Sequence, residues 1–195
     1  MSLCAAAARD AVRRNGAARL TLDAVAAEAK ISKASVLYDY KTKVALITAV
    51  IERRVAAENE RIQSRIRELG AGPDAVIRGR IAAASRSVSD ADRAVAVSLC
   101  AAAARDAALR APIQDAYRHW TSEIARTSTS PRGALLAFLA LEGLMLMEWF
   151  GLQSWPERER ERLLAEIEWL LHQSPGSSDE APAAPVNIAT LQPAG

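Results

Sequence analysis

The segment Leu20–Ile47 constrains the fold more than any other, because its pattern predicts two short helices, a tight turn and the start of a third helix. Thr21, Ser32 and Thr42 each stand directly before a helical pattern. A hydroxyl in that place can accept a hydrogen bond from the free amide groups of a helix start. About three or four residues separate the first two helices, which is the turn length of a helix-turn-helix. The segment therefore predicts a DNA-binding motif.

The outward side chains of the second short helix suit contacts with the edges of DNA bases. Val36 is expected to face inward, whereas Lys33, Ser35 and Leu37 can point outward. A recognition helix presents its N-terminal side chains to the bases, where lysine and serine can hydrogen-bond and leucine can contact a thymine methyl group. The predicted DNA-contact residues are Thr21, Ser32, Lys33, Ala34, Ser35, Leu37, Tyr38 and Lys43.

Several of these residues suit the DNA backbone, and each has a plainer alternative. Tyr38, Lys43 and Thr21 can contact phosphates, which fix the position of a protein on DNA rather than its sequence preference. Thr21 and Ser32 would also cap helices in any helical protein, and Lys33 and Lys43 can be ordinary solvated lysines. The joint spacing of these residues, and no one of them alone, favours a DNA-binding role.

The same stretch resembles the TetR-type transcriptional regulators. Their DNA-binding core ends close to V-S-[KR]-x-[TS]-[LIV]-Y-x-[HY]-F-x-[ST]-K-x-x-L, and residues 31–46 here are ISKASVLYDYKTKVAL. The resemblance covers about the first quarter of the chain. Four residues depart from the family pattern: Leu37 replaces a frequent tyrosine, Tyr40 a phenylalanine, Asp39 a common histidine and Lys30 the usual turn glycine. Because lysine disfavours the backbone that glycine allows, the turn is expected to be strained.

The resemblance implies a particular architecture and function. A three-helix, helix-turn-helix DNA-binding domain would be joined by a long helix to a C-terminal helical domain for regulation and dimerisation. Such a protein would be a cytoplasmic, ligand-responsive transcriptional regulator that binds a palindromic operator as a homodimer, and repression is the commoner mode in the family. Its partners would be double-stranded DNA, a second copy of the chain and a small, mainly apolar effector molecule.

Composition and helix punctuation agree with an all-α fold. Half of the residues are hydrophobic but only 5% are aromatic, and alanine, which favours helices, is abundant. Four prolines are expected at first helical positions: Pro73, Pro112, Pro131 and Pro156. The predicted helices are 2–15, 21–29, 33–39, 42–68, 73–87, 90–109, 112–127, 131–151 and 157–172. The predicted domains are 1–50 for DNA binding and 51–173 for ligand binding and dimerisation, followed by a flexible tail, 174–195.

Charge is divided unevenly along the chain. Residues 1–50 hold eight Lys or Arg against four Asp or Glu, a net charge of +4, so the remainder carries −2 within the total of +2. A basic N-terminal part beside a mildly acidic remainder suits DNA binding at one end only. Cys4 and Cys100 do not make a disulfide framework, and Arg9 and Asp10 interrupt any leader-like apolar run. No stretch of about 20 residues is apolar enough to span a bilayer. These observations favour a reduced, cytoplasmic chain.

The last two predicted helices indicate a dimer. In 131–151 apolar side chains cover almost the whole circumference, so one side can face the helix's own domain while the other needs a partner. The helix 157–172 carries an apolar stripe behind a charged run. TetR-type proteins build their four-helix dimer interface at this place. The predicted interface residues are Leu135, Phe138, Leu139, Leu146, Leu163, Ile167, Leu170 and Leu171.

A ligand cavity in the helical domain is also an implication of the resemblance. The ligand would be largely apolar. Glu142 stands alone in an apolar helix, where it can meet a cationic ligand or lie at the subunit edge. The candidate lining residues, each of which can instead be plain core or surface, are Tyr117, Trp120, Glu142, Met145 and Trp149.

Two other classes of protein are alternatives to a transcriptional regulator. An enzyme is disfavoured, because the chain has only His119 and His172, no metal-ligand spacing and no phosphate-binding loop; no cofactor or metal is expected. A helical dimerisation or adaptor protein without specific DNA binding is the alternative, against which the basic N-terminal part argues. The decapeptide SLCAAAARDA occurs twice, at Ser2–Ala11 and Ser98–Ala107, in two alanine-rich helical patterns, and no physical account of it follows from the sequence.

Overall fold

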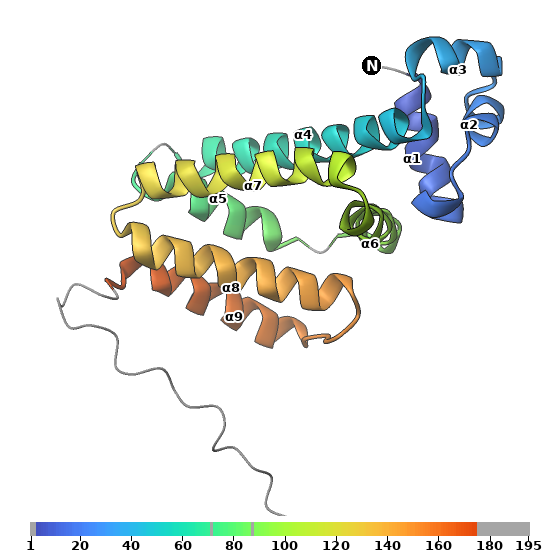
Figure 1. Ribbon diagram of the computed structural model, residues 1–195. Coiled ribbons are helices and arrows are strands. Elements are labelled where there is room, and N and C mark those ends of the chain that lie inside the picture. Colours follow the sequence, from blue (N-terminus) through green and yellow to red (C-terminus); the bar gives the residue numbers. More distant parts are fainter. Residues whose placement is uncertain (1–2, 71, 87, 175–195) are drawn as a thin grey trace, which may run out of the picture.

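The computed structural model describes residues 3–70, 72–86 and 88–174, and within them every regular element is a helix (Figure 1). The predicted flexible tail lies outside the described residues except for Ser174. No helix in the described part is long and apolar enough to cross a membrane. The α-helices are α1 (Leu3–Asn15), α2 (Leu22–Ala29), α3 (Lys33–Asp39), α4 (Lys43–Leu69), α5 (Ala75–Ala84), α6 (Asp90–Arg105), α7 (Ala107–Thr127), α8 (Pro131–Trp149) and α9 (Glu157–Trp169), with 3-10 turns at Ala17–Arg19 and Leu170–His172.

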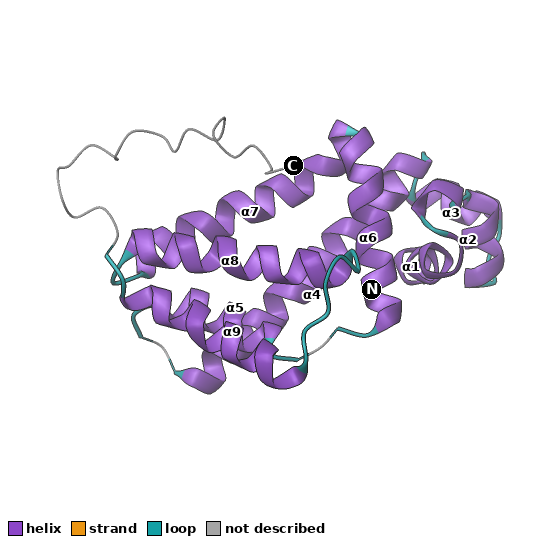
Figure 2. Ribbon diagram, turned by 90° about the horizontal axis from the view of Figure 1, so that it is seen from below, coloured by secondary structure: helices purple, strands orange, loops and turns teal. Residues whose placement is uncertain are grey.

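The long helix α4 connects the two parts of the molecule. Helices α1, α2 and α3 gather at one end of α4, and its other end runs into a body made of α5 to α9 (Figure 1). Helices α7, α8 and α9 run roughly alongside one another, and α8 contacts both of its neighbours (Figure 2). The all-α fold predicted from the sequence is confirmed. A three-helix unit that contains the helix-turn-helix lies at one end, and a helical body lies at the other.

The core of the N-terminal unit extends into the body. Val25, Val36 and Leu46 are fully buried in it, and Leu99 of α6 and Leu109 of α7 belong to the same cluster. The amide of the 3-10 turn after α1 donates a 2.7 Å hydrogen bond to a serine hydroxyl of α6. The N-terminal unit therefore packs against α6 as well as α4, so movement of either helix would displace α2 and α3.

A second core holds the body together. It joins Ile77 of α5, Ile124 of α7 and Leu141 of α8 with the apolar side of α9. Three residues predicted for the dimer interface belong to this core, which corrects that prediction: Phe138, Ile167 and Leu171, which are 2%, 7% and 1% exposed. They are buried because α8 and α9 turn these side chains toward the body of their own protomer.

Two glycines allow close approach of helices in the body. A Cβ atom on Gly79 of α5 would lie 2.5 Å from a side-chain carbon of Ile66 in α4. A Cβ atom on Gly133 of α8 would lie 2.4 Å from the carbonyl oxygens of both Leu170 and Gln173. Because backbone oxygens cannot rotate away as a side chain can, the second contact is the less tolerant of the two.

The break between α6 and α7 lies at Asp106, although helices over 90–109 and 112–127 were predicted. Asp106 has an extended backbone (φ −134°, ψ 118°), and its side chain accepts a 2.9 Å hydrogen bond from the amide two residues later. Pro112 therefore lies inside α7, where it lacks the amide hydrogen for one helical bond. The capped start at Asp106 and the guanidinium of Arg110, which donates to the last carbonyls of α6, stabilise the break at the earlier position. The other predicted helices agree with the structure to within three residues at each end.

Candidate nucleic-acid interface and buried cavity

The helix-turn-helix has a hydroxyl cap at the start of each of its helices, as predicted. The side chains of Thr21, Ser32 and Thr42 each accept a hydrogen bond of 3.0–3.1 Å from the amide three residues later. The turn between α2 and α3 passes through Lys30, whose backbone is left-handed (φ 56°, ψ 41°). A side chain is disfavoured in that conformation, so the predicted strain at Lys30 is confirmed.

The eight predicted DNA-contact residues are all exposed, whereas Val36 between them is fully buried. Leu37 and Tyr38 are 40% and 88% exposed. A tyrosine that projects almost entirely into solvent gains little from the folded protomer, which suits a contact with another molecule. Together these residues make α3 a short ridge whose inner side fixes it to the core and whose outer side is free.

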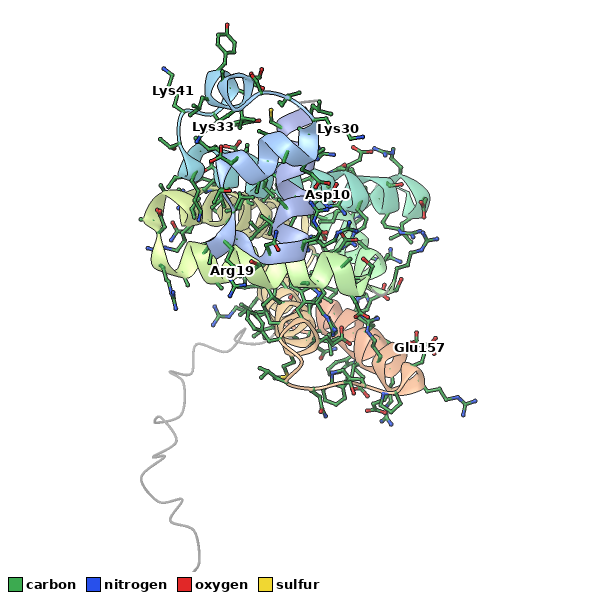
Figure 3. All side chains as sticks on the ribbon, turned by 90° about the vertical axis from the view of Figure 1, so that its right-hand side faces the viewer. Asp10, Arg19, Lys30, Lys33, Lys41 and Glu157 are labelled. Carbon is green, nitrogen blue, oxygen red and sulfur yellow. The ribbon has the colours of Figure 1, made fainter. Side chains whose placement is uncertain are left out.

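Lysine side chains surround this ridge, and Figure 3 shows Lys33 and Lys41 near one another beside α3. Lys33 Nζ forms a 2.9 Å ion pair with Asp23 Oδ2 of α2, and Lys43 Nζ donates a 2.6 Å hydrogen bond to the carbonyl of Ala18. Lys41 is exposed and forms no hydrogen bond or ion pair with any described residue. Lys41 belongs to the basic charge of residues 1–50 but was not among the predicted contacts, although its place directly before the cap of α4 was an available signal.

A partly open cavity of about 110 Å³ lies where α4, α5, α6, α7 and α8 meet. The structure brings all five candidate lining residues to its wall: Tyr117, Trp120, Glu142, Met145 and Trp149. The wall also contains four ionisable residues that were not predicted from the sequence: Arg54 and Glu58 of α4, Arg80 of α5 and Cys100 of α6. No local pattern connects these four with α7 and α8, because only the packing of the helices brings them together.

A buried ion pair between Arg80 and Glu142 forms part of the cavity wall, and their side chains are 5% and 12% exposed. Glu142 Oε1 accepts a hydrogen bond from Arg80 Nη2, and Oε2 accepts one of 2.6 Å from the hydroxyl of Tyr117. Burial, followed by the negative charge of Glu142, raises the pKa of Tyr117, so its hydroxyl stays protonated and donates. Glu142 was expected to meet a cationic ligand or to lie at the subunit edge; its cation is instead Arg80 of the same chain.

The guanidinium of Arg80 also lies against aromatic rings. Its Cζ is 4.2 Å from the ring centroid of Trp120 and 4.9 Å from that of Phe138. The Trp120 ring is held in place by a 2.7 Å hydrogen bond from its Nε1 to Asn59 of α4. The Nε and Nη1 atoms of Arg80 are buried and have no hydrogen-bond partner among the described residues. Cation–π attraction offsets part of the cost of burying this charge but does not replace an acceptor.

Arg54 is the second cation of the cavity. Burial lowers its pKa, while Glu58 and Asp92 oppose that effect. Each of those two carboxylates is already bound to another arginine, at 2.6 Å and 2.7 Å. Within the described ranges, Arg54 itself forms no ion pair, and its guanidinium lies over the Trp149 ring at 5.5 Å. The cavity wall therefore contains two arginines and two carboxylates, but Glu58 is already paired with Arg61 and Glu142 with Arg80, so Arg54 has no carboxylate of its own.

The outer side of α8 presents apolar side chains to solvent. Leu139 and Leu146, both predicted for a dimer interface, are 57% and 40% exposed. The predicted residues Leu135, Leu163 and Leu170 are partly buried. Other exposed apolar side chains on or near this side are Leu136, Met147, Phe150 and Leu152, with Trp169 on α9. An exposed apolar patch of this extent is typical of an interaction surface.

Comparison with known proteins places both parts of the chain. The family model described as bacterial regulatory proteins, tetR family, matches residues 5–50, and the tetracyclin repressor-like C-terminal domain matches residues 74–172. Comparison with curated protein sequences found no match.

Solved structures share the fold at low sequence identity. A protein assigned as a transcriptional regulator from Streptomyces coelicolor A3(2) is 18% identical, with a TM-score of 0.72 over 88% of this chain and 97% of that one. A TetR-family regulator from Mesorhizobium loti MAFF303099 is 19% identical, with a TM-score of 0.68 over 87% and 93%. A regulator from Saccharomonospora viridis in complex with choline is 17% identical, with a TM-score of 0.65 over 85% and 94%.

Proposed function

Because the chain belongs to the tetR family of bacterial transcriptional regulators, we propose that it is a ligand-responsive repressor that binds a palindromic operator as a homodimer. The observation that carries the DNA-binding part is the exposed ridge of α3. Lys33, Ser35 and Leu37 project from it beside Tyr38, which is 88% exposed, on a helix anchored from within by Val36. Such a helix can enter a major groove and contact base edges with its first residues.

The apolar side of α8 supports the homodimer. A dimer related by a two-fold axis would place two copies of α3 on successive half-sites about one helical turn of DNA apart. The exposed side chains of α8, Leu139 above all, would be removed from water in that dimer. A palindromic operator is the natural partner, since its symmetry matches that of the protein.

The path from the cavity to α3 supports regulation by a ligand. Helix α4 contributes Ile51 and Arg54 to the cavity wall and, one turn earlier, Leu46 and Ile47 to the core of the N-terminal unit. A ligand that displaces α4 or α6 would alter the separation of the two α3 helices. It can do so only through its different affinity for the two states, typically ~1–3 kcal/mol of coupling. The choline complex of the Saccharomonospora regulator is an example of a small molecule bound to a protein of this fold.

The test of this proposal is selection of a duplex from a randomised pool by the full-length chain, followed by affinity measurements at several salt concentrations. Lys43→Ala should weaken binding to all duplexes alike and, in a dimer, lower the salt slope by about 2. Lys33→Ala and Ser35→Ala should change the sequence preference. Arg118→Ala, which removes an exposed, ion-paired cation of α7, is the control and should change neither.

Salt-independent affinity that these variants leave unchanged would overturn the proposal. That result would favour the alternative of a helical dimerisation or adaptor protein without specific DNA binding. Equal affinity for every duplex in the pool, with a normal salt slope, would remove the operator but keep general DNA binding.

A further inference from the structure

The ion pair in the cavity wall has unused hydrogen-bond donors and no unused acceptor. Both oxygens of Glu142 already accept hydrogen bonds, from Arg80 and from Tyr117. Arg80 in contrast keeps Nε and Nη1 buried without a partner among the described residues. A buried donor without an acceptor is destabilising, so an occupant that presents an acceptor oxygen to Arg80 would be favoured. An occupant that brings only further donors would leave these Arg80 atoms without an acceptor.

Charge argues in the same direction. Glu142 is paired with Arg80, and Glu58, which also lines the cavity, is paired with Arg61, which does not line it. Arg54 is left as a cavity-lining cation with no ion pair in the described part of the chain. The three arginines exceed the two carboxylates by one positive charge, so a negative charge placed in the cavity would be attracted.

The size and remaining surface of the cavity limit the rest of the occupant. Its volume is about 110 Å³, and the side chains around the arginines include Trp120, Met145 and Trp149. An apolar protein cavity of about 150 Å³ is able to hold benzene. A body of about one ring therefore fits with small movements of side chains, whereas drug-sized ligands occupy several hundred Å³.

We propose that this cavity binds a small carboxylate with a compact apolar body about one ring in size. Its carboxylate accepts hydrogen bonds from Arg80 and is balanced in charge by Arg54, and its ring packs between Trp120 and Trp149. That this occupant is also the effector rests on the function proposed above. The binding chemistry itself does not depend on DNA.

The test is calorimetry of the full-length chain with three probes that share one ring: benzoate, benzylammonium and benzyl alcohol. Benzoate should bind with a Kd of about 1 mM or tighter, as expected for so small a ligand, and about tenfold or more tighter than the other two probes. Bound benzoate should also slow the alkylation of Cys100, which lines the same cavity. Benzylammonium that binds as tightly as benzoate, or benzoate that fails to bind at ~10 mM, would overturn the proposal.

Two variants locate the carboxylate. Arg54→Gln should weaken benzoate about tenfold or more without changing the binding of benzyl alcohol, since it removes a charge that holds no other residue by an ion pair. Arg118→Gln is the matched control on the outer surface of α7. The double variant Arg80→Met/Glu142→Gln removes both members of the buried pair at once, so no lone buried charge remains to unfold the protein. It should abolish the preference for benzoate over benzyl alcohol, and a preference that survives both variants would contradict the assignment.

DNA measurements distinguish the two proposals. If benzoate binds as described but leaves operator affinity unchanged, the binding site stands and regulation through this cavity is refuted. If the chain binds a selected operator but benzoate does not bind, the function stands and only the carboxylate assignment is wrong.

Discussion

Leu139→Glu should convert the proposed dimer into a folded monomer. The side chain is 57% exposed in the protomer, at the centre of the apolar outer side of α8. Complete burial of a leucine contributes about 1.5–3 kcal/mol, so burial of the exposed part contributes about 1–1.7 kcal/mol per copy and about 2–3 kcal/mol per dimer. This loss alone raises the dimer Kd about 30- to 150-fold. Because the new carboxylate must also lose its hydration, the total effect should exceed about 1000-fold.

Sedimentation velocity of the full-length chain over a range of concentrations measures this change. Leu3→Glu is the matched control, since Leu3 of α1 is 59% exposed but lies on the N-terminal unit, far along the molecule from α8 (Figure 1). It should leave the dimer Kd unchanged. Circular dichroism should show a nearly unchanged melting temperature for the Leu139→Glu monomer. Leu171→Glu should instead unfold the protein, because Leu171 is only 1% exposed within the protomer. A Leu139→Glu protein that dimerises as tightly as the parent chain would refute the placing of the interface on α8.

Three further predictions concern stability, thiol chemistry and DNA affinity. Gly133→Ala should lower the melting temperature by several degrees, because its Cβ would lie 2.4 Å from two carbonyl oxygens and such overpacking costs about 1–3 kcal/mol. Gly72→Ala is the control, since no atom lies within 4 Å of its Cβ, and it should leave the melting temperature unchanged. Equal melting temperatures for the two variants would contradict the close approach of α8. Burial raises the pKa of the Cys100 thiol, so iodoacetamide should label it more slowly than a free cysteine at neutral pH. The labelling rate should keep rising with pH above the ordinary cysteine pKa. A rate that reaches its plateau at that ordinary value would count against the burial. Asp23→Asn removes the partner of Lys33 and one negative charge, so affinity for all duplexes should rise about two- to fivefold at low salt. A loss of affinity would instead show that the ion pair positions Lys33 for DNA.

The helix-turn-helix could be predicted from the sequence because its determinants are local. A cap requires only a hydroxyl and an amide three residues apart, and the caps at Thr21, Ser32 and Thr42 are all present in the structure. The left-handed backbone of Lys30 was expected from the family resemblance, since Lys30 stands where the pattern has a turn glycine. Val36 is the buried residue of the seven-residue helix α3, and its inward position turns Lys33 and its neighbours outward.

The repeated decapeptide shows where local sequence stops being sufficient. In the first copy Asp10 lies inside α1, which continues to Asn15, whereas in the second copy Asp106 interrupts the chain between α6 and α7. Leu3 is 59% exposed, yet the equivalent Leu99 is 2% exposed. Identical residues thus take different conformations and bury different faces, because the neighbours that pack against each copy differ.

The cavity illustrates the same division in the candidate functional site. The family resemblance implied a cavity, and the aromatic and apolar character visible along single helices led to side chains of α7 and α8 as lining residues. The sequence could not provide Arg80 or Arg54, since nothing local indicates that a charged residue of α5 or α4 will be enclosed by other helices. Phe138, Ile167 and Leu171 were predicted for a dimer interface, whereas all three are buried within the protomer. The sequence by itself determined which segments are helical and where the DNA-binding motif lies, through caps and periodicity that act over a few residues. The tertiary structure alone decided which face of each helix is buried and which charges meet, because burial and ion pairing depend on residues far apart in the chain.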